Sequence, residues 1–158
     1  MYLTDLLSPN TIRVGLLGTD KNEIIGQTID LLADSEFVTD LEVVRNVVMG
    51  REAQMSTGVG KGLGLPHGKT SAATGSVAAL SVTAEPIEFD AFDGEPVRIV
   101  FLLVGPPEAQ TLHIRTLSRI SRIMNSGATR KLVLEATSPE EVYQAIHQAE
   151  EVLLEARV

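Results

Sequence analysis

The 158-residue chain contains no cysteine. It therefore cannot form a disulfide, bind zinc through thiolates or use a cysteine as a nucleophile. It has three histidines, and none lies three or four residues from another, which is the spacing of paired metal ligands on a helix. We therefore expect no metal site, and nothing in the sequence calls for another cofactor.

Long apolar runs and an excess of basic residues are also absent. The longest unbroken apolar run, residues 99–104, is far shorter than the roughly 20 residues of a membrane-spanning helix. Residues 1–9 lack the basic region and apolar core of a signal peptide. The net charge of −8 argues against nucleic-acid binding, which needs a basic face. These absences predict a cytoplasmic protein that does not insert into a membrane.

The sequence contains no internal repeat and no Pro/Gly/Ser-rich linker, which predicts a single domain over residues 1–158. Strand patterns occur at residues 12–16, 63–65, 76–82 and 97–104. The pair Asp93-Gly94 is typical of a turn, so we expect a hairpin between Phe89 and Val97.

Helix signals alternate with these strands. Asp20 with Glu23 begins one helix, and Thr39 with Glu42 begins a second that should end near Met55. A third helix is expected over residues 109–124, and a last one begins at residues 138–141, Ser-Pro-Glu-Glu. This order predicts an α/β layered fold, with a mixed β-sheet flanked by helices on both faces.

The most informative stretch is residues 56–68, STGVGKGLGLPHG, in which closely spaced glycines lead to His67. Glycines allow a backbone to approach a ligand closely, and successive N–H groups can bind an anion. We therefore expect Ser56, Thr57, Gly58 and Gly60 to bind a phosphate, and His67 to take and release a phosphoryl group. The alternatives are that Ser56 and Thr57 only shape the loop, and that His67 is structural.

Two other residues are candidates by their positions on expected helices. His113 lies on one stripe with Leu117, Ile120 and Met124, in the first turn of its helix. It is either a core histidine or a neutral hydrogen-bond donor to a phosphoryl group, because a helix N-terminus lowers the pKa of histidine.

Arg51 lies at the end of the second expected helix, directly before the glycine run. It could cap that helix or neutralise a phosphate, and both roles are compatible with its position. His147 lies beside the apolar stripe of the last helix, so we expect it to be exposed.

The string STGVGKGLGLPHGK resembles the phosphorylation-site signature of enzyme IIA of the bacterial phosphotransferase system, in the fructose/mannitol class that includes the nitrogen-regulatory branch. The strings PIEFDAFDGEPVRIVFLLVGP and QTLHIRTLSRISRIM resemble further blocks of this family, in the same order. The resemblance implies that His67 is the active histidine and His113 the supporting one. Gly64 stands where the family commonly has alanine.

The resemblance also implies a reaction and its partners. His67 would accept a phosphoryl group from an HPr-type phosphocarrier protein and pass it to a cysteine of a IIB domain. Because this chain has no cysteine, that IIB domain must be a separate molecule. As in the nitrogen branch, the phosphorylation state could instead switch binding to a transporter or a sensor kinase. A scaffold that has lost phosphotransfer is a third possibility, disfavoured by the intact His67.

Overall fold

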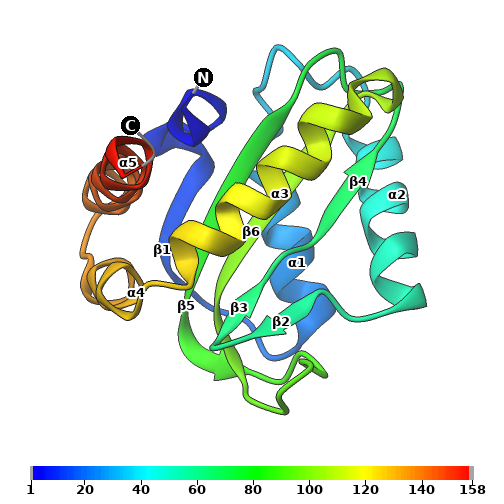
Figure 1. Cartoon of the computed structure of the whole chain (residues 1–158). Coiled ribbons are helices and arrows are strands. Elements are labelled where there is room, and N and C mark those ends of the chain that lie inside the picture. The colour runs from blue at the N-terminus through cyan, green and yellow to red at the C-terminus, as the bar shows by residue number, and fades with distance from the viewer. Residues whose placement is uncertain (1, 157–158) are drawn as a thin grey trace.

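The computed structural model describes residues 2–156, whose strands form a six-stranded mixed sheet (Figure 1). The strand order is β1-β5-β6-β3-β2, and β4 pairs with β6 beyond the end of β3. Strand β1 is parallel to β5, β5 is antiparallel to β6, and both β3 and β4 are parallel to β6. The strands are β1 (Ile12–Leu16), β2 (Gly58–Gly60), β3 (Leu63–Gly64), β4 (His67–Lys69), β5 (Val77–Ile87) and β6 (Val97–Gly105).

Helices cover both faces of this sheet, which confirms the predicted architecture (Figure 1). Helices α1 and α2 pack on one face, and α3, α4 and α5 pack on the other. No helix within residues 2–156 is both long enough and apolar enough to cross a membrane. The helices are α1 (Lys21–Asp30), α2 (Leu41–Gln54), α3 (Gln110–Met124), α4 (Gly127–Glu135) and α5 (Pro139–Glu155), with 3₁₀ turns at Leu3–Leu6, Pro9–Thr11 and Pro107–Ala109.

The central strand β6 contributes to both hydrophobic cores, because successive side chains of a strand point to opposite faces. Its apolar run is fully buried, as expected for a strand covered on both sides. The core against α3–α5 contains Ile99, Phe101 and Leu103, and the core against α1 and α2 contains Val100, Leu102 and Val104.

The predicted hairpin joins β5 to β6. Ile87 pairs with Val97, and the N–H of Gly94 donates to the carbonyl oxygen of Ala91 in a turn at the predicted place. Strand β5 is longer than predicted, because it continues beyond Val82 to Ile87. The connection is therefore a loop over residues 88–96 rather than a two-residue turn.

The predicted helix starts are mostly confirmed. The side chains of Asp20 and Ser138 accept the N–H groups that cap α1 and α5. The prediction was wrong for α2, whose cap is Asp40 rather than Thr39. The hydroxyl of Thr39 instead donates to the carbonyl oxygen of Ala72. Helix α4 was not predicted, because it is short and buries only Thr129 and Val133.

Strand β6 also fixes the position of His67. Leu63 of β3 pairs with Ile99, and His67 of β4 pairs with Leu103, so the short segment between β3 and β4 is held at both ends. The N–H of Leu103 donates to the carbonyl oxygen of Pro66, 3.1 Å away.

Two glycines of the motif provide space for neighbouring groups. A Cβ atom at Gly68 would lie 3.0 Å from Cγ1 of Val47, so glycine allows α2 to pack closely against β4. A Cβ atom at Gly64 would lie 2.7 Å from Cε2 of Phe89, whose ring is fully buried. The buried ring of Phe89 therefore occupies the space that the common alanine would need.

We predict that Gly64→Ala lowers the free energy of unfolding by about 1–3 kcal/mol, because the added methyl group overpacks the core against Phe89. Urea unfolding monitored by circular dichroism measures this change. Gly50→Ala is the matched control, since a Cβ atom at this position in α2 meets nothing within 4 Å. It should stabilise the helix by up to about 1 kcal/mol. Equal effects of the two substitutions would contradict the packing argument.

Candidate functional site

A cavity of about 600 Å³ lies between β4, α2 and the N-terminal half of α3. These three elements meet at the upper right of Figure 1. The structure thus brings together three of the predicted site residues, Arg51, His67 and His113. The cavity is lined by these three residues and by Asn46, Val47, Gly50, Gln54, Gly68, Lys69, Ile114 and Leu117.

His67 is half-buried at the start of β4 and is held through one ring nitrogen. Its Nδ1 lies 2.8 Å from the carbonyl oxygen of Leu65. A carbonyl oxygen can only accept, so Nδ1 carries the proton and donates. Nε2 makes no hydrogen bond within residues 2–156, and in this tautomer it carries the free lone pair. The geometry therefore leaves Nε2 as the nucleophilic nitrogen.

His113 lies on α3 beside His67, with 5.8 Å between the ring centroids. The residue is only 4% exposed, and neither of its ring nitrogens finds a hydrogen-bond partner among the described residues. A neutral imidazole has one N–H donor, and leaving a buried donor without an acceptor costs about 1–3 kcal/mol. The ring is therefore a donor without an acceptor next to a nucleophile.

The environment of His113 lowers its pKa from the ordinary 6.5 to about 4. Burial is the largest cause, followed by the repulsion that the protonated form of His113 would meet from the neighbouring His67 ring, when that ring is also protonated, and from Lys69. A neutral ring is consistent with this lowered pKa, whose largest cause is burial rather than the helix N-terminus that the sequence suggested.

Arg51 occupies the last turn of α2 and contributes to the cavity wall. Its Nη1 donates to the carbonyl oxygen of Met55, 3.0 Å away, so it caps the C-terminal end of the helix. This bond uses one of five N–H donors of the guanidinium group. The capping role is present in the structure, and the position at the cavity remains compatible with binding an anion.

Lys69 is a site residue that the sequence analysis missed. Its Nζ donates to Oε1 of Gln110 on α3, 3.1 Å away, and its exposed side chain lines the cavity. The signal was its position two residues after His67, which places both side chains on one face of a strand. It became informative only once residues 67–69 were known to form β4.

Ser56 and Thr57 do not line the cavity, and their polar groups have other partners. The hydroxyl of Ser56 donates to the carbonyl oxygen of Phe89 and accepts the N–H of Gly58. Thr57 donates both its N–H and its hydroxyl to the carboxylate of Glu52. These contacts favour the alternative in which the two residues shape the loop, and they do not support a phosphate-binding role.

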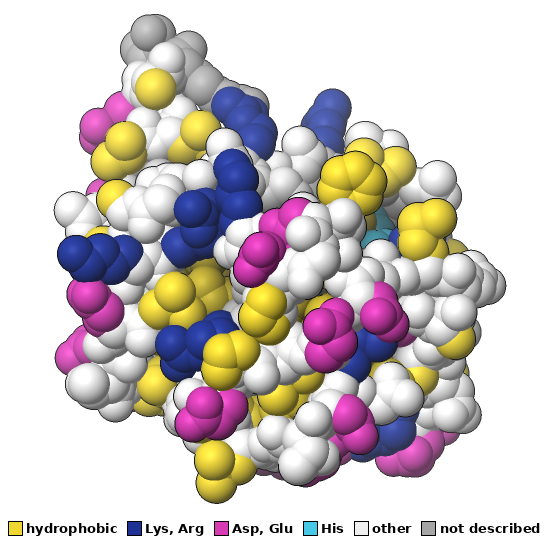
Figure 2. Space-filling view, turned by 90° about the horizontal axis from the view of Figure 1, so that it is seen from below, with side chains coloured by type: hydrophobic (Ala, Val, Ile, Leu, Met, Phe, Trp, Pro, Cys, Tyr) yellow, Lys and Arg dark blue, Asp and Glu magenta, His cyan; other side chains and the backbone are white. Residues whose placement is uncertain are grey.

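Gly58 and Gly60 form β2, which pairs with β3 instead of making an open anion-binding loop. Gly60 lines a different cavity, of about 440 Å³, together with Lys61 and Arg122. The phosphate-binding expectation for Gly58 and Gly60 therefore has no support in their placement. Figure 2 shows one face of the molecule, on which basic and acidic side chains are interspersed.

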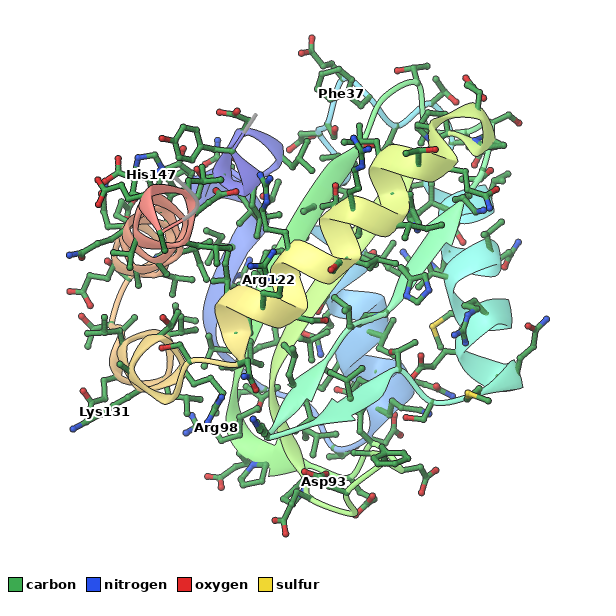
Figure 3. The ribbon with its side chains drawn as sticks, viewed as in Figure 1. Phe37, Asp93, Arg98, Arg122, Lys131 and His147 are labelled. Carbon is green, nitrogen blue, oxygen red and sulfur yellow. The ribbon has the colours of Figure 1, made fainter. Side chains whose placement is uncertain are left out.

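His147 was expected to be exposed, but its side chain is only 34% exposed. Its Nδ1 lies 3.0 Å from the hydroxyl oxygen of Thr4, and its Nε2 lies 3.1 Å from a carboxylate oxygen of Glu151. The N-terminal segment covers this part of α5, which the sequence pattern of the helix alone did not show. Figure 3 shows His147 on α5, at the far side of the molecule from β4.

The described residues include no group of three or more His, Cys, Asp or Glu side chains that could hold a metal ion. The chemistry available in the cavity is therefore that of two imidazoles and two cations. Such a set suits the binding and transfer of an anionic group.

The lowered pKa of His113 predicts a specific pH dependence of stability. Between pH 6.5 and about 4, His113 binds a proton in the unfolded chain but not in the folded protein. Protonation of the unfolded chain therefore lowers the free energy of unfolding as the pH falls through this range, whereas above pH 6.5 His113 causes no such loss. The free energy of unfolding of wild type, relative to His113→Gln, should fall by up to about 1.4 kcal/mol per pH unit in this window.

Urea unfolding of both proteins at several pH values measures this difference, in which the common titration of carboxylates cancels. Lys69→Met should narrow the pH range over which the two proteins differ, because the charge of Lys69 contributes to the lowered pKa of His113. Parallel pH profiles of wild type and His113→Gln would contradict the burial of a neutral ring.

Three comparisons with known proteins agree with this geometry. The family model described as phosphoenolpyruvate-dependent sugar phosphotransferase system, EIIA 2, matches residues 5–149. The chain is 33% identical over 123 residues to the fructose-specific EIIA component of Haloferax volcanii, covering 78% of this chain and 80% of that protein. It is 28% identical over 148 residues, or 94% of this chain, to the fructose-specific EIIABC component of Bacillus subtilis, and spans 23% of the length of that protein.

Among solved structures, the nitrogen regulatory protein IIA-Ntr from Neisseria meningitidis matches with a TM-score of 0.85 and 28% identity. The match covers 91% of this chain and 98% of that one. Because the family model spans most of the sequence and the fold agrees, the chain belongs to the EIIA 2 family of the phosphoenolpyruvate-dependent sugar phosphotransferase system.

Proposed function

We propose that this chain is a phosphohistidine carrier that holds a phosphoryl group on Nε2 of His67. One observation carries the proposal: the bond from Nδ1 to the carbonyl oxygen of Leu65 leaves Nε2 unprotonated beside the cavity. A neutral imidazole with a fixed tautomer is a nucleophile at neutral pH without help from a base.

In the proposed reaction the donor is the phosphohistidine of an HPr-type protein. The lone pair of His67 Nε2 attacks phosphorus, a P–N bond forms, and the P–N bond of the donor breaks with its electron pair left on the donor imidazole. Nδ1 keeps its proton throughout, and the Leu65 carbonyl oxygen balances the positive charge of the phosphorylated ring. No proton transfer is required at His67.

The phosphoryl oxygens would meet three donors around His67. The buried N–H of His113 would gain the acceptor that it lacks, and Arg51 and Lys69 would supply positive charge. Preorganised donors of this kind stabilise charge best where water is excluded. Ile114 is 57% exposed at the rim of the cavity and offers an apolar contact to a docking protein.

The second half of the reaction requires a thiolate that attacks phosphorus and leaves the electron pair of the broken P–N bond on His67. Since this chain has no cysteine, we assign that thiolate to a separate IIB domain. The similarity to a fructose-specific EIIABC component, of which this chain spans only one part, supports a partner of this kind.

A second candidate function is regulation. The similarity to a nitrogen regulatory protein favours it, as does the charge that phosphorylation would add at the cavity, about −1.5 to −2 at neutral pH. In that case the phosphorylation state would switch binding to a transporter or a sensor kinase. A target that binds only one of the two states would favour this function over a plain carrier.

We predict that phosphoenolpyruvate, enzyme I and an HPr-type carrier together label the wild-type protein with one acid-labile, base-stable phosphate. His67→Ala should abolish the label, because His113, the other imidazole of the cavity, is only 4% exposed and lies out of reach of a docking phosphate donor. His147→Ala is the matched control and should be labelled like wild type, since His147 lies on α5. Labelling of His67→Ala would refute the assignment.

Arg51→Gln separates the two roles of Arg51. If its charge stabilises the phosphoryl group, the substitution should slow phosphorylation by about 10²-fold, the usual cost of losing one preorganised donor. The lost bond to Met55 should lower the free energy of unfolding by only about 0.3–1 kcal/mol. Rapid-quench labelling and urea unfolding measure the two effects. Normal phosphorylation with reduced stability would leave Arg51 as a helix cap alone.

A further inference from the structure

Glu52 is a buried carboxylate that none of the steps above uses. It is 3% exposed in the last turn of α2, one residue after Arg51. Its oxygens accept the N–H of Thr57 at 3.1 and 3.2 Å and the hydroxyl of Thr57 at 2.7 Å. The Nζ of Lys21 on α1 lies 3.4 Å away and supplies a counter-charge. A buried carboxylate is tolerated only with such partners.

Backbone hydrogen bonds lead from this carboxylate to His67. The carbonyl oxygen of Thr57 accepts the N–H of Leu65 at 2.9 Å. The carbonyl oxygen of Leu65 in turn accepts Nδ1–H of His67 at 2.8 Å. Glu52 therefore fixes Thr57, Thr57 fixes Leu65, and the carbonyl group of Leu65 selects the tautomer of His67.

We propose that Glu52 is a positioning residue for His67, acting through Thr57 and Leu65. The proposal rests on the phosphocarrier function for its kinetic consequence, but the structural part concerns the unphosphorylated protein. In this proposal Thr57 links Glu52 to Leu65 and does not bind phosphate.

The same lysine also lies near the ring of Phe89. Nζ of Lys21 lies 5.6 Å from the centroid of the Phe89 ring, and that ring packs directly on Gly64. Leu65 is thus bonded to Thr57, which Glu52 holds, and the neighbouring Gly64 packs against Phe89. These contacts support the peptide segment that carries the Leu65 carbonyl group.

The direction of that carbonyl group matters for reactivity. A histidine side chain without a fixed partner populates both neutral tautomers, and the one protonated at Nε2 has no lone pair there. Displacement of a reacting group by about 1 Å can reduce a rate by 10²-fold. Removing the contacts that fix Thr57 should therefore lower the population of the His67 tautomer protonated at Nδ1 and also misalign its Nε2.

The test substitutes Glu52→Gln, which places an amide NH₂ where a carboxylate oxygen faced the donors of Thr57. Nitrogen-15 NMR of the His67 ring in the unphosphorylated protein reads the tautomer directly. We expect one tautomer in wild type and a mixture in Glu52→Gln. Phosphorylation by an HPr-type donor should slow by roughly 10- to 100-fold. Thr57→Val removes only the hydroxyl bond to Glu52, so it should shift the His67 spectrum in the same direction as Glu52→Gln but by less. Thr57→Ser keeps the hydroxyl group and should give the wild-type spectrum.

Glu150 supplies a matched control. It is fully buried in α5, both its oxygens accept the N–H of Leu3 at 2.6 Å, and Nη1 of Arg119 lies 3.1 Å away. Glu150→Gln should lower stability but leave the His67 spectrum and the phosphorylation rate unchanged.

Two outcomes would overturn the proposal: an unchanged His67 spectrum in both Glu52→Gln and Thr57→Val, or an equal change in Glu150→Gln. A shifted tautomer in Glu52→Gln, combined with a wild-type protein that accepts no phosphate, would refute the phosphocarrier function and support the positioning role.

Discussion

The hydrogen bond from His67 to the carbonyl oxygen of Leu65 is the interaction on which the proposed chemistry depends, because it leaves Nε2 as the ring nitrogen with a free lone pair. It exists because β3 and β4 pair with β6 on either side of the Leu65–Pro66 step. Strand β6 is itself fixed by two hydrophobic cores on opposite faces of the sheet. The position of one lone pair thus follows from the apolar packing of the whole fold.

The net charge of the chain and the charge of the residues around the cavity have opposite signs. The net charge is −8, yet the ionisable side chains on the cavity wall are Arg51, Lys69 and the two histidines. Burial and the nearby positive charges keep His113 neutral, so it enters the site as a donor and not as a further cation. The positive charge therefore comes from flexible side chains at the rim, while the buried part of the cavity is neutral.

The sequence predicted the parts of this site that depend on one helix or one long strand. The helical spacing of His113 placed it correctly on a buried stripe, and Arg51 was found at a helix end. The sequence could not show where Thr57 donates, because its partner Glu52 is set by the path of the chain after α2. Nor could it show Lys69, because β4 has only three residues and is recognisable only through its pairing with β6.

The glycine run shows that a pattern can direct attention to a residue that lines a cavity, His67, for a physical reason that the structure does not support. The run was interpreted as an open loop of anion-binding N–H groups, whereas Gly64 and Gly68 instead allow Phe89 and α2 to pack against the strands around His67. The donor that is free for an anion is the ring of His113, which the structure keeps buried without an acceptor. A buried donor left without an acceptor costs about 1–3 kcal/mol, so an acceptor placed beside this ring would be bound favourably. In the proposed function, an oxygen of the phosphoryl group on His67 is the acceptor for the N–H of His113, and this hydrogen bond would favour the phosphorylated state.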